Sequence, residues 1–253
     1  MPITDRDTMT GLAKGLAVIE SFSLDHPRQS ITEVAAATGL DRATARRCLL
    51  TLAHHGYADW DGKFFTLTPR ILRLGTACLA SMPLPQIVQP ALDALSEEIG
   101  ESTSVSILDG AEIVYVARAA QRRIMSIALM PGSRLPAYCT SMGRVLLAAL
   151  PEPEMRRILG PHPLPARTPR TLTDPDRIAD CIATVRLQGH ALIDQEVELG
   201  LRSLAVPLLN ARGKVVAALN VGTAATAMTV DDLADRFLDR LLSVRDRLRG
   251  MIA

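Results

Sequence analysis

A regularly spaced group of basic side chains lies in the segment Asp41–His55. Ala45, Leu49 and Leu52 recur at helical spacing and predict one buried helix face. The opposite side of that helix carries Arg42, Thr44, Arg46 and Arg47. Arginine pairs with guanine or phosphate, and threonine contacts a base edge or a thymine methyl group. The segment therefore predicts a helix that reads DNA, with a solvated basic face as the alternative.

The neighbouring elements favour DNA binding. Ser30–Glu33 has the spacing of a capping box, Gly39 ends the short helix that follows, and Asp41 can cap the next helix. Residues 57–67 form two short strand patterns around the hairpin turn Asp61-Gly62. Two helices, a turn, a third helix and a β-ribbon predict a winged helix-turn-helix domain. Three further cations are candidates for phosphate contacts: Lys63, Arg70 and Lys14.

A second group of polar side chains lies in the C-terminal half. Thr140, Ser141 and Met142 open a predicted helix directly after the strand-like run LPAY, so their free amides and the helix dipole form an anion-binding corner. Ser203 begins one apolar strand, and Asn220 interrupts another. A buried polar side chain needs a partner, and a ligand is one such partner. For Asn220, neighbouring backbone groups are an equal alternative.

Other chemically active residue types have plainer interpretations. Arg134 and Arg118 are candidate partners for a carboxylate, although strand and loop arginines more often face solvent. The adjacent pair His54-His55 diverges on a helix, so it cannot readily chelate one ion. Three acids in one turn would suit a metal ion or acid–base catalysis: Asp194, Glu196 and Glu198. Between a helix and a strand we expect them to be solvated or paired with Arg202.

The apolar periodicity predicts the remaining elements. Helices are expected at Leu12–Phe22, Pro69–Ser81, Ser141–Leu150, Ile178–Leu187 and Val230–Leu248, and another ends at Ile99 after starting or kinking at Pro90. Strands are expected at Ser102–Leu108, Ile113–Ala117, Met125–Leu129, Ser203–Leu208 and Lys214–Val221. With a Pro-rich boundary at residues 82–85, we divide the chain into a DNA-binding domain at 1–68, a linker helix at 69–85 and a second domain at 86–253.

The composition limits the function classes. The chain has 253 residues, of which 48% are hydrophobic and 22% charged, and a formal net charge of +1, so nucleic-acid binding needs a local basic patch. The four cysteines are too far apart in sequence for a zinc or disulfide framework. Nucleotide-binding, hydrolase and zinc-protease motifs are absent, so no cofactor, metal or enzymatic activity is expected. With no apolar run of bilayer length and an acidic N-terminus, we expect a cytoplasmic protein.

Along nearly its whole length the chain resembles the IclR family of bacterial transcriptional regulators. The runs that carry the resemblance are LAKGLAVIESF (12–22), ITEVAAATGLDRATARRCLLTL (31–52), LPAYCTSMGRVLLA (135–148) and GHALIDQEVELGLRSLAVPLLNARGKVVAALNVG (189–222). The resemblance implies an α+β protein, with a winged helix-turn-helix domain and a GAF-like effector-binding domain. It also implies dimerisation through the N-terminal region and tetramers built as dimers of dimers. The run DQEVELGLRSLAVP is similar to the branch that regulates aromatic-acid catabolism through the β-ketoadipate pathway.

The resemblance also implies a set of effector-binding positions. They are Ser141, Met142, Ser203, Asn220 and Gly222, with Ile124, Ile127 and Leu135 as an apolar wall; Arg134 is added as a carboxylate partner. Ile193 stands where some family members have an acid, and Asn220 and Gly222 stand where some have hydroxyls. With Tyr138 and Tyr115 nearby, such a site would suit a ring or a longer chain better than the smallest keto acids.

Taken together, these patterns predict a ligand-responsive, sequence-specific transcriptional regulator. Its expected partners are double-stranded operator DNA, a small aromatic or dicarboxylic acid, and further copies of itself. A hydrolase or transferase with an accessory helical domain is the rival class, and it lacks a catalytic motif. A protein-interaction adaptor is disfavoured because the arginine-bearing helix face is intact.

Overall fold

The computed structural model describes residues 7–23, 25–121 and 129–252. The chain divides into two compact units, residues 1–80 and residues 81–253. Among the described residues, none of the helices combines the length and apolar character needed to cross a bilayer.

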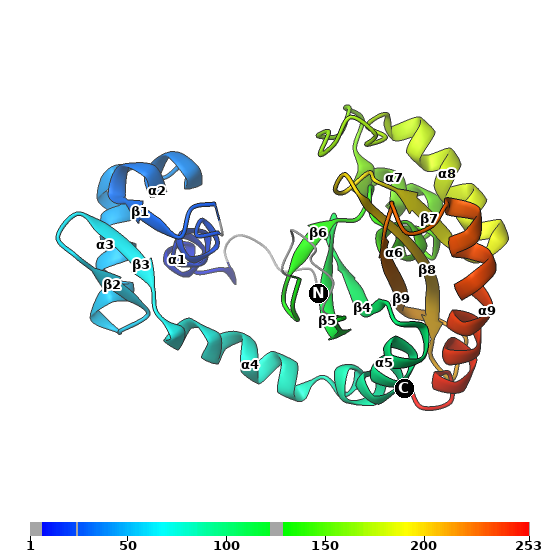
Figure 1. Ribbon diagram of the computed structural model, residues 1–253. Coiled ribbons are helices and arrows are strands. Elements are labelled where there is room, and N and C mark those ends of the chain that lie inside the picture. The colour runs from blue at the N-terminus through cyan, green and yellow to red at the C-terminus, as the bar shows by residue number, and fades with distance from the viewer. Residues whose placement is uncertain (1–6, 24, 122–128, 253) are drawn as a thin grey trace. The chain divides into compact units, whose positions relative to one another are not determined.

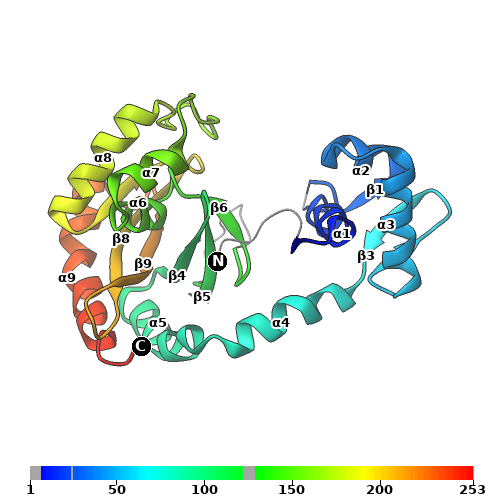
Figure 2. The ribbon, with the colours of Figure 1, turned by 180° about the vertical axis from the view of Figure 1, so that it is seen from behind.

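The first unit combines helices with a small antiparallel sheet (Figures 1 and 2). Its helices are α1 (Thr10–Glu20), α2 (Ile31–Thr38) and α3 (Arg42–His54). Its strands are β1 (Arg28–Ser30), β2 (Ala58–Trp60) and β3 (Phe64–Leu67), in the order β1-β3-β2. The winged helix-turn-helix prediction is confirmed, and β1 adds a strand that the sequence patterns did not predict.

Local cap chemistry sets the ends of α2 and α3. The Glu33 amide donates to Ser30 Oγ over 3.4 Å, and the Ser30 amide donates to Glu33 Oε2 over 2.6 Å, so the capping box is present. Gly39 ends α2 with φ of +69°. The Thr44 amide then donates to Asp41 Oδ1 over 2.8 Å at the start of α3. These contacts fix the corner between the two helices.

The core of the first unit fixes which face of each helix points outward. Val18, Ala45, Leu49 and Phe65 are fully buried together. On α1 the packed side is that of Val18, whereas the apolar side containing Leu12 is exposed. The helix predicted at 12–22 is therefore present, but its most apolar stripe does not enter this core.

The segment between the units contains more helix than the sequence patterns predicted. A 3-10 turn at Pro69–Ile71 leads into α4 (Leu72–Ser81), and α5 (Pro83–Ile99) begins after Met82. Pro83 and Pro85 lie in the first turn of α5, where the amide of a helix residue has no intrahelical partner to lose. The Pro-rich segment therefore starts a helix, and Pro90 lies inside that helix rather than at its start.

The second unit is built around one antiparallel sheet. Within the described residues its strand order is β6-β5-β4-β9-β8-β7. The strands are β4 (Ser102–Asp109), β5 (Glu112–Ala119), β6 (Arg134–Pro136), β7 (Ala191–Asp194), β8 (Leu201–Leu209) and β9 (Val215–Ala224). The helices that follow α5 are α6 (Ser141–Ala148), α7 (Glu152–Leu159), α8 (Pro175–Gln188) and α9 (Val230–Leu248).

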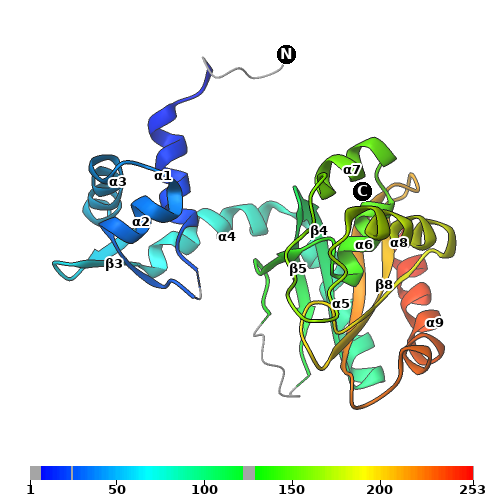
Figure 3. The same cartoon turned by 90° about the horizontal axis from the view of Figure 1, so that it is seen from above.

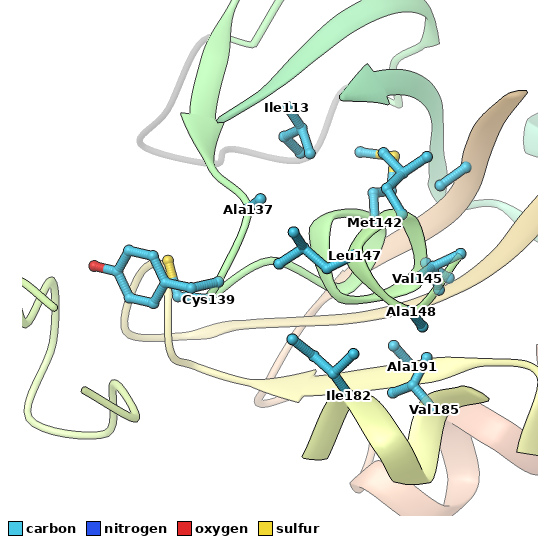
Figure 4. Close-up of a cluster of buried hydrophobic side chains, with 14 of the residues drawn as sticks. Ile113, Ala137, Cys139, Met142, Val145, Leu147, Ala148, Ile182, Val185 and Ala191 are labelled. Carbon is cyan, nitrogen blue, oxygen red and sulfur yellow. The ribbon is translucent and has the colours of Figure 1, made fainter. Parts of the chain in front are cut away.

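The helices cover both faces of this sheet. α5 and α9 pack on one face against alternate strand residues such as Leu204 and Leu219. α6 packs on the other face with α8 beside it (Figure 3). Figure 4 shows Met142 and Val145 of α6 among the buried side chains of this second core, with Ile182 of α8 below. The predicted mixed α/β second domain is confirmed.

Several secondary-structure predictions need correction. Residues 125–128 of the predicted strand Met125–Leu129 lie outside the described residues, and Leu129 is not in a strand. The strand-like run LPAY overlaps the three-residue strand β6, whereas α7 and the four-residue strand β7 were not predicted. Such short strands are defined by pairing with distant segments, which leaves little periodicity to detect.

Candidate functional site

The outward side of α3 carries the basic residues that the sequence singled out. Arg42, Arg46 and Arg47 are exposed, and Thr44 is half-buried. The Thr44 hydroxyl donates to Asp41 Oδ2 over 2.7 Å, which is the main reason that the pKa of Asp41 is lowered. Thr44 thus stabilises the N-cap of α3. Its methyl group and the lone pairs of its hydroxyl oxygen remain to contact a base. The DNA-binding roles of these residues remain predictions.

The β2–β3 hairpin is held by a charged network at its turn. Asp61 Oδ1 accepts hydrogen bonds from the Lys63 amide over 2.9 Å and the Phe64 amide over 2.8 Å. Arg28 of β1 pairs with the same carboxylate, and its guanidinium carbon lies 4.2 Å from the centroid of the Phe64 ring. The Phe64 amide and then Arg28 hold the pKa of Asp61 far below its usual value. Arg28 is a cation beside the predicted wing that the sequence patterns missed.

The other predicted phosphate contacts lie at separate places in the first unit. The Lys63 ammonium lies 4.9 Å from the Phe64 ring centroid at the hairpin. Arg70 follows the ribbon, with its guanidinium carbon 5.4 Å from the centroid of Tyr57. Lys14 of α1 lines a groove of about 490 Å³ between α1 and α3, together with Arg47.

In the second unit, the polar residues predicted to bind an effector converge on one small cavity between α6 and the sheet. Six of the predicted positions line it: Leu135, Ser141, Met142, Ser203, Asn220 and Gly222. The other lining residues are Ser102, Tyr115, Arg118, Leu129, Thr140, Val197 and Leu201. Its volume is about 30 Å³, room for about one or two water molecules.

The start of α6 is placed at this cavity by an unusually close backbone contact. Thr140 caps the helix by accepting the Gly143 amide on Oγ1 over 3.1 Å. A Cβ atom built on Gly143 would lie 2.1 Å from the carbonyl oxygen of Ala137, so only glycine lets the preceding segment pack against the first turn. The amides of Ser141 and Met142 precede the first intrahelical bond and remain available at the positive end of the helix dipole.

Two transverse rows of strand residues form the floor. In the first row, Ser104 of β4 pairs with Arg118 of β5 on one side and with Asn220 of β9 on the other. In the second, Gly222 of β9 lies between Ser102 and Ser203. Residues directly opposite each other on neighbouring strands project to the same face. Both rows therefore present their side chains toward α6, and Gly222 leaves a gap among them.

Asn220 carries the clearest sign of an unfilled interaction. The residue is 8% exposed, and its buried Oδ1 has no hydrogen-bond partner among the described residues. A buried amide oxygen without a partner is costly, so it marks a position where a ligand or a bound water supplies the missing bond. The alternative, a side chain satisfied by neighbouring backbone, is not what the structure shows.

Tyr115 and Arg118 are further polar members of the wall. Burial raises the pKa of Tyr115 to about 12, so its phenol stays protonated at neutral pH. Burial lowers the pKa of Arg118, whose guanidinium donates to Ser104 Oγ over 2.9 Å. Alternation of Ser102, Ser104 and Ser106 along one strand was the sequence signal that could have indicated this polar floor.

Arg134 requires a correction. Its guanidinium pairs with Asp109 over 2.8 Å and with Glu112 over 2.7 Å on the exposed side of the β4–β5 hairpin. It does not line the cavity. Ile124 and Ile127 lie outside the described residues.

Other residues expected near the effector also lie apart from the cavity. The Tyr138 hydroxyl donates a hydrogen bond to the Pro165 carbonyl, and Tyr138 does not line the cavity. Ile193 is buried, and it is not part of the cavity wall either.

Two of the three acids near the β7–β8 turn form ion pairs. Asp194 pairs with Arg202, as expected, and also with Arg170 over 2.6 Å. Glu196 instead forms a buried ion pair with Arg144 over 2.8 Å, because the turn folds back onto α6. Glu198 has a buried Oε2 without a partner in the described part of the chain, and burial raises its pKa. In that part of the chain no cluster of three metal-ligand side chains occurs.

Comparison with known proteins covers both units. The family model described as the IclR helix-turn-helix domain matches residues 11–62, and that of the bacterial transcriptional regulator IclR C-terminal domain matches residues 76–247. The chain is 48% identical over 240 residues to the Pca regulon regulatory protein of Pseudomonas putida, covering 94% of this chain and 82% of the relative. It is 37% identical to the p-hydroxybenzoate hydroxylase transcriptional activator of Acinetobacter baylyi, covering 99% and 94%.

A solved structure is similar to the second unit. It is the inducer-binding domain of a PobR double mutant from Acinetobacter in complex with 3-hydroxybenzoic acid. The TM-score is 0.63 at 32% identity, and the match covers 66% of this chain and 98% of that one.

Proposed function

The chain belongs to the IclR family of bacterial transcriptional regulators, and we propose that it controls genes of aromatic-acid catabolism in response to a small aromatic acid. It is a DNA-binding regulator rather than an enzyme, as its family and its relatives are. The names of those relatives refer to the Pca regulon and to p-hydroxybenzoate hydroxylase, and a related inducer-binding domain holds 3-hydroxybenzoic acid. These likenesses support the choice of aromatic acids as the effector class.

The observation that carries the proposal is the orphaned Asn220 oxygen in the cavity beneath α6. Around it lie the free amides at the start of α6 and the hydroxyls of Ser141 and Ser203. This combination of donors and acceptors suits a carboxylate or a ring hydroxyl, and Leu135 and Met142 supply apolar contact for a ring.

The small size of the cavity gives a reason for ligand-dependent behaviour. Small-molecule pockets are usually about 300–1,000 Å³, whereas this one is about 30 Å³. An aromatic acid therefore has to displace side chains, and the unbranched Met142 is suited to move. A ligand that binds the opened arrangement better than the closed one shifts the equilibrium between them.

In the first unit, we assign base and phosphate contacts to the exposed side of α3. Arg42, Thr44, Arg46 and Arg47 would enter the major groove from this helix. The hairpin cation Lys63 would contact the backbone, with weaker assignments for Arg70 and Lys14. The division into a reading domain at 1–68, a linker helix at 69–85 and a sensing domain at 86–253 is part of the same proposal. The linker helix would transmit the effector's influence.

We further propose that the functional form is a homodimer that pairs into a tetramer. Leu12 and Leu16 of α1 are 61% and 47% exposed and line the groove against α3. An exposed apolar strip of this kind supports dimerisation through the first unit. A bacterial regulator of chromosomal genes acts in the compartment that contains the chromosome, so the proposed location is the cytoplasm.

The test of the function uses the full-length chain. Genomic fragments retained by the protein are sequenced, and affinity for the recovered sequence is measured against a scrambled duplex at several salt concentrations. The same DNA is then titrated in the presence of 4-hydroxybenzoate, 3-hydroxybenzoate or a neutral phenol. We expect a preferred duplex, strong salt dependence and a change in affinity with at least one acid. Equal affinity for both duplexes, or no response to either acid, would contradict the proposal.

A further inference from the structure

Arg118 is a cation in the wall of the cavity beneath α6. It lies on β5, is half-buried, and gives a hydrogen bond to Ser104 Oγ over 2.9 Å. The backbone at this position is also fixed, because Gln89 Nε2 of α5 donates to the Arg118 carbonyl over 3.1 Å. The guanidinium therefore belongs to an ordered wall of the cavity.

Among the described residues, no carboxylate pairs with Arg118. Three other arginines of this unit differ: Arg134, Arg144 and Arg202 each have an aspartate or glutamate partner within 2.8 Å. A guanidinium carries five N–H donors, and one hydrogen bond to a hydroxyl uses few of them. A partly buried charge without a counter-ion is unfavourable unless an anion joins it.

The register of the sheet places two further donors beside this guanidinium. Arg118, Ser104 and Asn220 occupy one transverse row on β5, β4 and β9 and project to the same face. Ser104 accepts the bond from Arg118, so its own hydroxyl proton is free to be donated. Asn220 Oδ1 has no partner in the described part of the chain, and the amide nitrogen of the same side chain is the donor that this residue adds to the row. The row thus offers N–H and O–H donors with no anion among them.

We propose that Arg118 binds the carboxylate of the effector, with Ser104 and Asn220 as neighbouring donors, so that the site selects organic anions over neutral isosteres. This inference rests on the proposed function, because it names the group that recognises the effector in the same cavity. The rest of the molecule would lie beside Gly222, which has no side chain, once neighbouring side chains are displaced from the cavity of about 30 Å³. A Cβ atom there would meet, among the described residues, Leu201 Cδ1 at 3.7 Å, which is ordinary contact distance.

The test measures acid and amide binding side by side. The full-length chain and its Arg118→Gln variant are titrated calorimetrically with 3- and 4-hydroxybenzoate and with the corresponding hydroxybenzamides. The matched control is Arg134→Gln, which removes an arginine of the same unit that is paired on the surface and lies outside the cavity. Arg118→Lys keeps the positive charge but lacks the planar guanidinium group, which can donate two parallel hydrogen bonds to a carboxylate.

The wild-type chain should bind an acid at least about tenfold more tightly than its amide, because a charge-assisted hydrogen bond is the stronger one. Arg118→Gln should weaken acid binding by about tenfold or more and change amide binding less than about threefold. Arg118→Lys should keep part of the preference, and Arg134→Gln should match the wild type. If Arg118→Gln does not fold, Asn220→Asp replaces it, and its added negative charge should abolish acid binding selectively.

Two results would overturn this inference while leaving the proposed function intact: an unchanged acid-over-amide preference in Arg118→Gln, or an equal loss in Arg134→Gln. A wild-type chain that binds DNA but neither acid would instead contradict the proposed sensing function, and the role of Arg118 would be rejected with it.

Discussion

Single residues in this chain act through their electrostatic surroundings. Asp61 accepts two backbone amides and pairs with Arg28, so its carboxylate holds the β2–β3 turn in place. Asn220, by contrast, is buried with an oxygen that has no partner among the described residues. The first arrangement stabilises structure, whereas the second leaves an interaction open for a ligand.

The Asp61 network predicts a pH dependence of stability. Its pKa is lowered in the folded chain, so its contribution is present above the unfolded-state value of about 3.9 and is lost as pH falls toward the folded value. Asp61→Asn should therefore destabilise the first unit at pH 7, and the difference from wild type should shrink between pH 4 and pH 3. Fluorescence of Trp60, the single tryptophan, follows unfolding here because it stacks on Phe65.

The control for this measurement is Asp59→Asn in the same hairpin. Asp59 is exposed and has no ion pair among the described residues. Identical melting of the Asp59 and Asp61 variants at every pH would show that the turn network does not stabilise the unit.

The arginines of α3 give a second residue-scale prediction. Arg46→Ala or Arg47→Ala should weaken operator binding by about 1–3 kcal/mol where the side chain reads a base, and should lower the salt slope where it meets phosphate. Fluorescence anisotropy at several salt concentrations separates the two roles. Arg157→Ala, an exposed arginine on α7 of the other unit, is the control. Unchanged affinity and salt slope in both α3 variants would remove this helix from the interface.

At the scale of elements, the first turn of α6 depends on one glycine. A Cβ on Gly143 would lie 2.1 Å from the Ala137 carbonyl oxygen, so Gly143→Ala forces the two backbone segments apart. Such overpacking costs about 1–3 kcal/mol. We expect this loss in urea unfolding followed by circular dichroism, together with weaker acid binding.

Gly250 supplies the comparison for that variant. It belongs to the same unit, and a Cβ there would meet nothing within 4 Å in the described structure. Gly250→Ala should therefore leave both stability and acid binding near wild type. If Gly143→Ala is equally well tolerated, the close contact does not position the cavity.

The predictability of these elements follows from the range of the interactions that form them. The ends of α2 and α3 could be predicted because the caps Ser30–Glu33 and Asp41–Thr44 are local in sequence. The three-residue strand β1 exists through pairing with the distant strand β3, which no local pattern records. For the same reason the packed side of α1, at Val18, could not be distinguished from the apolar stripe at Leu12.

The candidate site shows the same division. Ser203 and Asn220 could be singled out because a polar residue inside an apolar strand is unusual. The choice between Arg118 and Arg134 depends on sheet register and on the acids of the β4–β5 hairpin, so it needed the structure. Val197 and Leu201 reach the cavity through the fold-back of the β7–β8 turn, for which the sequence carried no signal.

At the scale of the whole molecule, one winged helix reads too few base pairs for tight specific binding. Two copies related by symmetry read an inverted repeat. We expect light scattering at micromolar protein to give at least a dimer, and the full operator to bind much more tightly than a half-site. Leu16→Glu should lower the mass, because it puts a charge on the exposed apolar strip of α1.

The control for the assembly prediction is Leu187→Glu. This leucine is 90% exposed on α8, and its substitution should leave at least a dimer. A monomeric wild-type chain that binds a half-site as tightly as the operator would contradict the account of assembly.

The central claim is that an acid bound in the second unit alters DNA binding by the first, and an effector dose–response of operator binding tests it most directly. Ser203→Leu and Asn220→Leu remove a hydrogen bond and fill the cavity, so they should cost about 1.5–3 kcal/mol of effector affinity. The dose–response should shift accordingly in both variants, while operator affinity without acid stays near wild type. Identical dose–response curves for the wild type and both variants would show that the sensing site lies elsewhere.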